Sequence, residues 1–192
     1  MNIVPPSTAD EWHGFLRAYS TEFPDSPFMR RMAADGRADQ FLSAAQRSAG
    51  WLGFEPASAD DIAAAEQRLG VRLPPAYRNF LLTSNGWNTI SYAVDLLPIA
   101  EVGWFPDVEP ELIRAWEGTE LLDEYGSVLE RSLVVSMDDG GAGQYLFLHA
   151  AEVADDGEWT AYEWWPGDGE DPYRYAGFGV LIADLWKQAR EN

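Results

Sequence analysis

The chain has 192 residues, a length that predicts one domain or one domain with an elaborated end. Hydrophobic residues make up 46% and charged residues 23% of it, which predicts a folded core and argues against wholesale disorder. The formal net charge is −19, from 13 basic and 32 acidic residues. Such a charge repels phosphate and anionic membrane surfaces, because nucleic-acid binding depends on Lys and Arg displacing counterions. We therefore expect no nucleic acid and no membrane as partner, and favour a basic protein partner.

The charge is unevenly placed along the chain. Residues 1–100 hold 8 basic and 11 acidic residues, a net charge of −3, whereas residues 101–192 hold 5 and 21, a net charge of −16. Solubility alone gives no reason for this asymmetry, so the second half is a candidate interaction face. The alternative, that the acidity only keeps the chain soluble, stays open.

The chain contains no cysteine, which excludes disulfides, thiolate metal sites and a cysteine nucleophile. Its first residues lack the basic and apolar segments of a signal peptide. The longest uncharged apolar stretches, such as residues 175–183, are about nine residues long, too short to cross a membrane. We expect a soluble cytoplasmic protein without a cofactor.

Three helices are predicted in the first fifty residues. Thr8 and Glu11 form the pattern of a capping box, followed by apolar residues at the spacing of one helical face. Prolines then break the chain, and further helices are predicted over residues 28–34 and 38–48. Because their apolar stripes need a surface to cover, residues 1–50 are assigned to a helical N-terminal extension of a domain formed by residues 51–192.

The segment from residue 51 to 86 has the clearest helix signals. Ser58 with Asp61 predicts a capping box, and Gly70 ends the helix that follows. Glu66 lies in the apolar stripe of that helix, where a carboxylate needs donors from backbone amides, Arg72 or Arg78; a structural role is favoured over a functional one.

A second helix of this segment should start at Pro74 and Pro75 and end at Asn85 and Gly86.

The remainder is predicted to be mostly sheet. Residues 92–99 look extended, and short helices are predicted within residues 106–118 and 120–125. Strands are expected at residues 133–137, 145–149 and 159–165, with a hairpin connection at 138–143, an acidic loop at 166–172 and a final helix from Phe178. Helices first and strands later predict an α+β fold, an antiparallel sheet with helices packed on one face.

Sequence signatures of catalysis are missing. There is no Gly-x-Ser-x-Gly elbow, no His-Glu-x-x-His pair, no phosphate loop and no dinucleotide fingerprint. His149 with Glu152 is a weak candidate for a metal or acid–base pair, and Asp168, Glu170 and Asp171 for calcium, although this loop lacks the twelve-residue calcium pattern. The protein is therefore predicted not to be an enzyme.

The order and spacing of residues in segment 51–86 resemble a known family. The pattern comprises Trp51-Leu52-Gly53-Phe54, Pro56-Ala57-Ser58, Ile62, Glu66, Leu69-Gly70, Leu73-Pro74, Tyr77-Arg78, Phe80-Leu81 and Asn85-Gly86. It resembles the signature of the SUKH superfamily, whose namesakes include fungal cell-wall synthesis regulators, and weaker similarity extends to about residue 190.

The resemblance implies an α+β fold without known enzymatic activity. Bacterial members are similar to immunity proteins, which bind and neutralise toxins that are often nucleases or deaminases. The residues that would shape the scaffold are Glu66, Gly70, Leu73, Pro74, Tyr77, Phe80, Asn85 and Gly86.

The leading interpretation is an immunity-type protein that captures a basic toxin with its carboxylates. The predicted contact residues are Glu101, Trp104, Asp107, Glu109, Glu111, Asp138, Asp139, Asp168, Glu170 and Asp171, whose carboxylates are expected in loops or turns. One alternative is a regulatory scaffold protein of the same family with other cellular partners. The other is a cryptic hydrolase or metal-dependent enzyme that uses His149.

Overall fold

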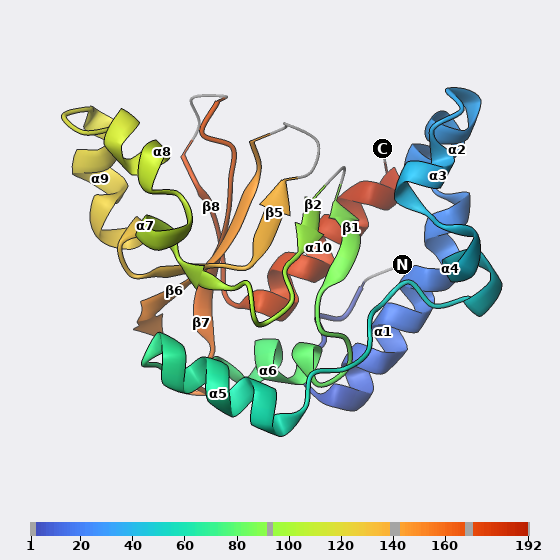
Figure 1. Cartoon of the computed structure of the whole chain (residues 1–192), viewed down its shortest axis with the longest axis horizontal. Coiled ribbons are helices and arrows are strands. Elements are labelled where there is room, and N and C mark those ends of the chain that lie inside the picture. The colour runs from blue at the N-terminus through green and yellow to red at the C-terminus, as the bar shows by residue number, and fades with distance from the viewer. Residues whose placement is uncertain (1–2, 92–93, 139–142, 168–170, 192) are drawn as a thin grey trace.

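The computed structural model describes residues 3–91, 94–138, 143–167 and 171–191, and it confirms the α+β prediction (Figure 1). The helices are α1 (Ala9–Glu22), the short 3₁₀ helix η1 (Phe23–Asp25), α2 (Pro27–Ala34), α3 (Ala38–Phe41), α4 (Ala44–Ala49), α5 (Ala59–Leu69), α6 (Pro75–Leu81), α7 (Phe105–Val108), α8 (Pro110–Ala115), α9 (Glu120–Leu129) and α10 (Phe178–Glu191). The strands are β1 (Trp87–Ser91), β2 (Val94–Leu96), β3 (Gly103–Trp104), β4 (Ser132–Val134), β5 (Ser136–Asp138), β6 (Tyr145–Val153), β7 (Trp159–Trp164) and β8 (Tyr173–Tyr175).

The strands form two antiparallel sheets. The larger sheet has the order β3-β4-β6-β7-β8 and the smaller one β1-β2-β5. The predicted strand at residues 133–137 is divided between them, because the main chain crosses at Val135: its N–H donates to Leu146 O at 3.0 Å, and its carbonyl accepts from Leu97 N at 2.9 Å. The connection predicted as a hairpin therefore follows β5 of the smaller sheet and leads to β6 of the larger one; its residues 139–142 lie outside the described chain.

The main core lies between one face of the large sheet and the helices α1, α6 and α10. Leu146 and Leu148 of β6 contribute to it, together with an aromatic cluster from the helices. Within this cluster the rings of Tyr19 and Trp186 are 4.1 Å apart, and those of Phe80 and Phe178 5.3 Å. The N-terminal helix α1 thus shares its core with the last helix of the chain.

A second, smaller core occupies the opposite face of the same sheet. Phe147 of β6 lies between Leu146 and Leu148, so its side chain points to the other face, where it clusters with Phe105 and Trp164. The short helices α7, α8 and α9 cover this cluster. The predicted helical layer on one face is present, and these three helices add a layer on the other.

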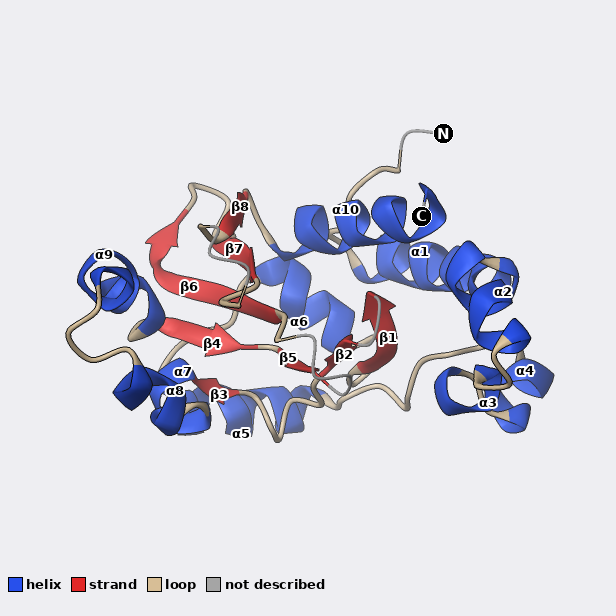
Figure 2. Cartoon of the chain, turned by 90° about the horizontal axis from the view of Figure 1, so that it is seen from above, coloured by secondary structure: helices blue, strands red, loops and turns tan. Residues whose placement is uncertain are grey.

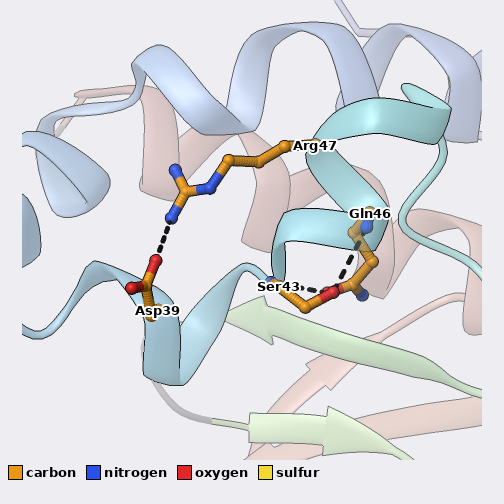
Figure 3. A network of polar contacts seen from close by, with 4 residues as sticks. All are labelled: Asp39, Ser43, Gln46 and Arg47. Carbon is orange, nitrogen blue, oxygen red and sulfur yellow. Dashed lines mark hydrogen bonds and ion pairs between the residues drawn. The ribbon is translucent and has the colours of Figure 1, made fainter.

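The predicted helix over residues 38–48 is interrupted and becomes α3 and α4. Leu42 adopts an extended conformation and is buried in the main core, and Ser43 then caps α4 through a capping box with Gln46 (Figure 3). An ion pair of 2.8 Å between Arg47 and Asp39 joins the two short helices. Burial of Leu42 and the cap at Ser43 together outweigh helix continuity here.

Helix α6 starts as predicted but ends at Leu81, before Asn85 and Gly86, so the prediction that these two residues end it is wrong. Both residues instead make contacts from the segment that leads from α6 to β1. The Oδ1 of Asn85 accepts a hydrogen bond from Ile99 N at 2.8 Å, and Gly86 has a φ of 98° in a tight approach to Leu96. Both residues therefore fix the entry to the small sheet.

Candidate protein-interaction site

Residues 105–130 form a strongly acidic segment, which we call the acidic arm. It contains eight carboxylates and a single basic residue, Arg114. Its helices α7, α8 and α9 lie at the end of the molecule opposite α2, α3 and α4 (Figure 2). The arm therefore concentrates negative charge at one end of an already acidic protein.

The sequence of the arm separates its apolar residues from its acidic ones. Its apolar side chains pack on the sheet, where the rings of Trp116 and Trp164 are 4.9 Å apart and those of Phe105 and Phe147 6.0 Å. The carboxylates are left on the outside: Asp107, Glu111, Glu117, Glu120, Asp123, Glu124 and Glu130 are exposed, and Glu109 is half-buried. Burial of one side thus fixes a rigid acidic surface on the other.

Three of the predicted contact residues belong to this arm. Asp107 lies in α7 and Glu111 in α8, so the prediction that they occupy loops is wrong for both; Glu109 lies at the junction of the two helices. Glu111 forms an exposed ion pair with Arg114 on its own helix. The short helices form because Pro106 and Pro110 occupy first-turn positions, where proline is favoured.

Two other predicted contact residues precede the arm. Glu101 is exposed in a turn before β3. Trp104 ends β3, is half-buried against the main core and donates its indole N–H to Leu69 O at 3.3 Å. Its indole is thus held by the scaffold, and only its exposed edge is open to a partner.

The remaining predicted residues lie further along the chain. Asp171 is exposed and lies beside the hydroxyl of Tyr125 in α9, where burial, then Asp171 and then Glu124 raise the pKa of Tyr125 to about 12. Asp171 is therefore brought to the arm from a distant part of the sequence. Asp138 ends β5 opposite Val94 in the small sheet, whereas Asp139, Asp168 and Glu170 lie outside the described residues.

Sequence reasoning missed the acidic residues of the second half of the arm. Glu117, Glu120, Asp123 and Glu124 are all exposed, and their signal was present in the uneven charge of residues 101–192. The contact carboxylates were predicted in loops and turns, whereas Glu120, Asp123 and Glu124 lie in α9 and Glu117 lies shortly before it.

Six of the eight predicted scaffold residues lie at the connection between α5 and α6 or in the helices beside it, whereas Asn85 and Gly86 lie at the entry to the small sheet. The Oε1 of Glu66 accepts a hydrogen bond from Leu73 N at 2.9 Å and forms an ion pair with Arg78, one of the two arginines proposed for it. Gly70 ends α5 with a φ of 71°. Leu73, Pro74, Tyr77 and Phe80 are buried. This network makes the connection rigid.

Comparison with known protein families gives a match that includes the connection between α5 and α6. A family model, described as the SMI1/KNR4 family (SUKH-1), matches residues 56–184. The chain belongs to this family. Proteins of the SMI1/KNR4 family include toxin-immunity proteins and related regulators, which interact with protein partners. No curated protein matches the chain.

The family match begins three residues before α5 and ends within α10. It therefore includes the acidic arm and both sheets of this SMI1/KNR4 protein, and it leaves α1–α4 outside. Among the described residues, no helix combines the length and the apolar character needed to cross a bilayer.

His149 and Glu152, the weak candidate for a metal or acid–base pair, each contact a residue of another strand. His149 is buried, its Nδ1 lies 3.3 Å from the Oγ of Ser132, and burial lowers its pKa, partly opposed by Glu152. Glu152 itself forms an ion pair of 2.5 Å with Arg174. Within the described ranges, no group of three or more His, Asp or Glu residues is arranged to hold a metal ion. These contacts give both residues roles in joining β4, β6 and β8.

Proposed function

We propose that this SMI1/KNR4 protein is an immunity-type protein that neutralises a basic toxin by direct contact through the acidic arm. The observation that carries the proposal is the arm itself: seven exposed carboxylates, five on helices and two in the adjoining turns, while the apolar side chains of the arm pack on the sheet. A toxin that acts on nucleic acid needs Lys and Arg to bind phosphate. A rigid acidic surface is complementary to such a toxin and competes with its substrate.

The proposed contact surface combines the arm with neighbouring residues. Glu101 and the exposed edge of Trp104 border it at β3, and Asp171 borders it beside Tyr125. Asp138, Asp139, Asp168 and Glu170 remain proposed contacts on grounds of sequence alone. Because most of the exposed carboxylates of the arm stand on helices that pack against the sheet, little conformational entropy is lost when a partner binds them.

The proposal is tested by co-expression with a toxin domain encoded beside the gene for this protein. The arm variant carries Asp107→Asn, Glu111→Gln and Glu117→Gln. The control variant carries Asp10→Asn, Asp35→Asn and Glu55→Gln, three exposed carboxylates far from the arm, and changes the net charge by the same amount. We expect the wild type and the control to protect growth and to bind the purified toxin domain, and the arm variant to do both less well.

Two outcomes would contradict the proposal. Equal loss of protection in both variants would mean that only net charge matters. Recovery of several weakly bound cellular proteins, with no protection against any neighbouring toxin, would favour the regulatory scaffold role known in the same family.

A further inference from the structure

A cleft of about 480 Å³ opens between the connection of α5 to α6 and the turn from β6 to β7. Its lining includes Arg72, Pro75, Arg78, Val153, Asp156 and Gly157. In Figure 1 these elements lie at the bottom of the molecule, whereas α8 and α9 lie at its upper left. The cleft is therefore separate from the acidic arm.

The guanidinium of Arg72 has no hydrogen bond or ion pair with any residue in the described part of the chain, although most arginines there have one. Its backbone is nevertheless held in place, because Val71 N donates to Glu66 O at 3.2 Å and Leu73 N to the Glu66 carboxylate at 2.9 Å. The backbone at Arg72 is therefore fixed, while its guanidinium at the mouth of the cleft has no partner among the described residues. Such preorganisation lowers the cost of binding an anion.

Arg78 adds a second cation to the cleft. Only its Nη1 is used, in the ion pair with Glu66. A guanidinium has five N–H donors, so the others are available to a ligand. Asp156 contributes the one carboxylate of the lining, where its Oδ1 already accepts a hydrogen bond from Glu158 N at 3.1 Å. Since Glu66 neutralises Arg78, Arg72 is the cation of the lining whose charge no ion pair balances within the described chain, in a protein of net charge −19.

This charge limits the ligands that fit. A partner with a broad acidic surface is repelled by the net negative charge of this protein. The ligand must therefore place a single small anionic group in the cleft. One guanidinium without an ion pair, that of Arg72, matches one carboxylate better than a phosphate dianion. Val153, which is 56% exposed, and the exposed Pro75 give the cleft apolar walls that an apolar side chain of a ligand can cover.

We propose that this cleft binds a short peptide segment of a partner protein that carries one carboxylate beside an apolar side chain. The carboxylate pairs with Arg72, and the apolar side chain lies against Val153 and Pro75. A volume of about 480 Å³ lies within the range of ligand pockets. The carboxylate is either the carboxyl end of the partner or an internal Asp or Glu, and the experiment distinguishes them. The proposal does not depend on the function of the acidic arm.

The test titrates the ¹⁵N-labelled full chain with three peptides and follows the amide signals by NMR. The peptides are N-acetyl-leucyl-leucine with a free carboxylate, the same peptide as its amide, and N-acetyl-leucyl-aspartate amide. We expect signals of Arg72 and Gly157 to shift with one or both carboxylate peptides and to stay in place with the leucyl-leucine amide. Binding of the first alone assigns a carboxyl terminus, and binding of the third an internal acidic residue.

Two variants and a control complete the test. Arg72→Gln is expected to weaken binding about tenfold or more, the effect of losing a charged hydrogen-bond partner, and Val153→Ser is expected to weaken it less. Arg37→Gln, an exposed arginine of the N-terminal helical region, is expected to leave it unchanged. The proposal is overturned if neither carboxylate peptide shifts these signals, if the amide binds equally well, or if inorganic phosphate displaces the peptide at equal concentration.

Discussion

The indole Nε1 of Trp12 in α1 donates a hydrogen bond of 2.8 Å to the carbonyl of Ala76 in α6. Trp12 lies outside the segment that matches the family, and Ala76 lies inside it. The Trp12 ring is fully buried and lies 5.2 Å from Phe80 and 5.5 Å from Phe178. We therefore propose that the N-terminal extension, residues 1–50, is a structural part of the folded unit and not an independent domain.

Replacement of Trp12 tests this role. Trp12→Ala should lower the free energy of unfolding by about 3–5 kcal/mol, because it leaves a large cavity in the main core. Trp12→Phe keeps most of the bulk but removes the hydrogen bond to the Ala76 carbonyl, at a cost of about 0.5–1.5 kcal/mol. Urea unfolding measures both, with Ala18→Ser on the exposed side of α1 as control. A Trp12→Ala variant as stable as the control would show that the extension is dispensable for stability.

Gly86 offers a second test of the scaffold. Its φ of 98° and the approach of Leu96 O, 2.8 Å from the position of an added Cβ, leave no room for a side chain. Gly86→Ala should therefore cost more than the roughly 1 kcal/mol expected from a positive φ alone. Gly36 is the matched control, with a φ of 70° and open space around it. Equal melting temperatures for the two alanine variants would contradict the steric argument.

Local patterns predicted much of the fold from the sequence. The capping boxes at Thr8 and Ser58 have the predicted geometry, because a cap is fixed by residues three positions apart. The break at Leu42 has one local signal of this kind, the capping box of Ser43 with Gln46, but it also depends on the burial of Leu42 in the main core. The crossing at Val135 was not predictable from local patterns, because it depends on hydrogen bonds to residues of two different sheets.

For the candidate sites too, the sequence predicted features that depend on local composition but not those that depend on contacts between distant residues. The uneven charge predicted an acidic surface in the second half, and the arm provides one. The position of Asp171 beside Tyr125 could not be inferred, since 46 positions separate them in the chain. The cleft at Arg72 was missed for a similar reason, because Val153 and Asp156 reach it only through the pairing of β6 with β7.

Glu158 provides a pH-dependent prediction. Its Oε1 accepts a hydrogen bond from Ala76 N at 2.7 Å, while its Oε2 is buried without a hydrogen-bond partner among the described residues. Burial, and to a lesser extent Asp156, raise the pKa of Glu158 above its ordinary value of 4.5. The folded protein therefore keeps this proton at a higher pH than the unfolded chain, and stability falls as pH rises from 4.5 through the raised pKa.

Glu158→Gln keeps an acceptor for Ala76 N and removes the charge. The variant should be more stable than the wild type at pH 7. The gain should shrink as the pH falls through the raised pKa toward 4.5, and it should be lost below 4.5, where Glu158 is protonated in both states. Urea unfolding at a series of pH values measures the difference. Glu55→Gln, an exposed carboxylate, is the control. A gain that is the same at every pH would rule out ionisation of Glu158 as its source.

The salt dependence of toxin capture distinguishes steering by the acidic arm from simple contact. Exposed charges act over about 10 Å at 0.1 M salt and mainly accelerate association. The association rate constant of the wild type with the toxin domain should therefore fall about tenfold between about 50 mM and about 300 mM NaCl. The arm variant should start lower and fall less steeply, whereas the control variant with Asp10, Asp35 and Glu55 neutralised should follow the wild type.

Stopped-flow mixing at several salt concentrations measures these rate constants, and the dissociation rate constant should change little in any variant, because the neutralised residues are exposed. The arm and the control variant have the same net charge, so any difference between their slopes reports where the charge is placed. If both slopes equal that of the wild type, the partner is not steered by this surface, and the acidic arm has no special part in recognition.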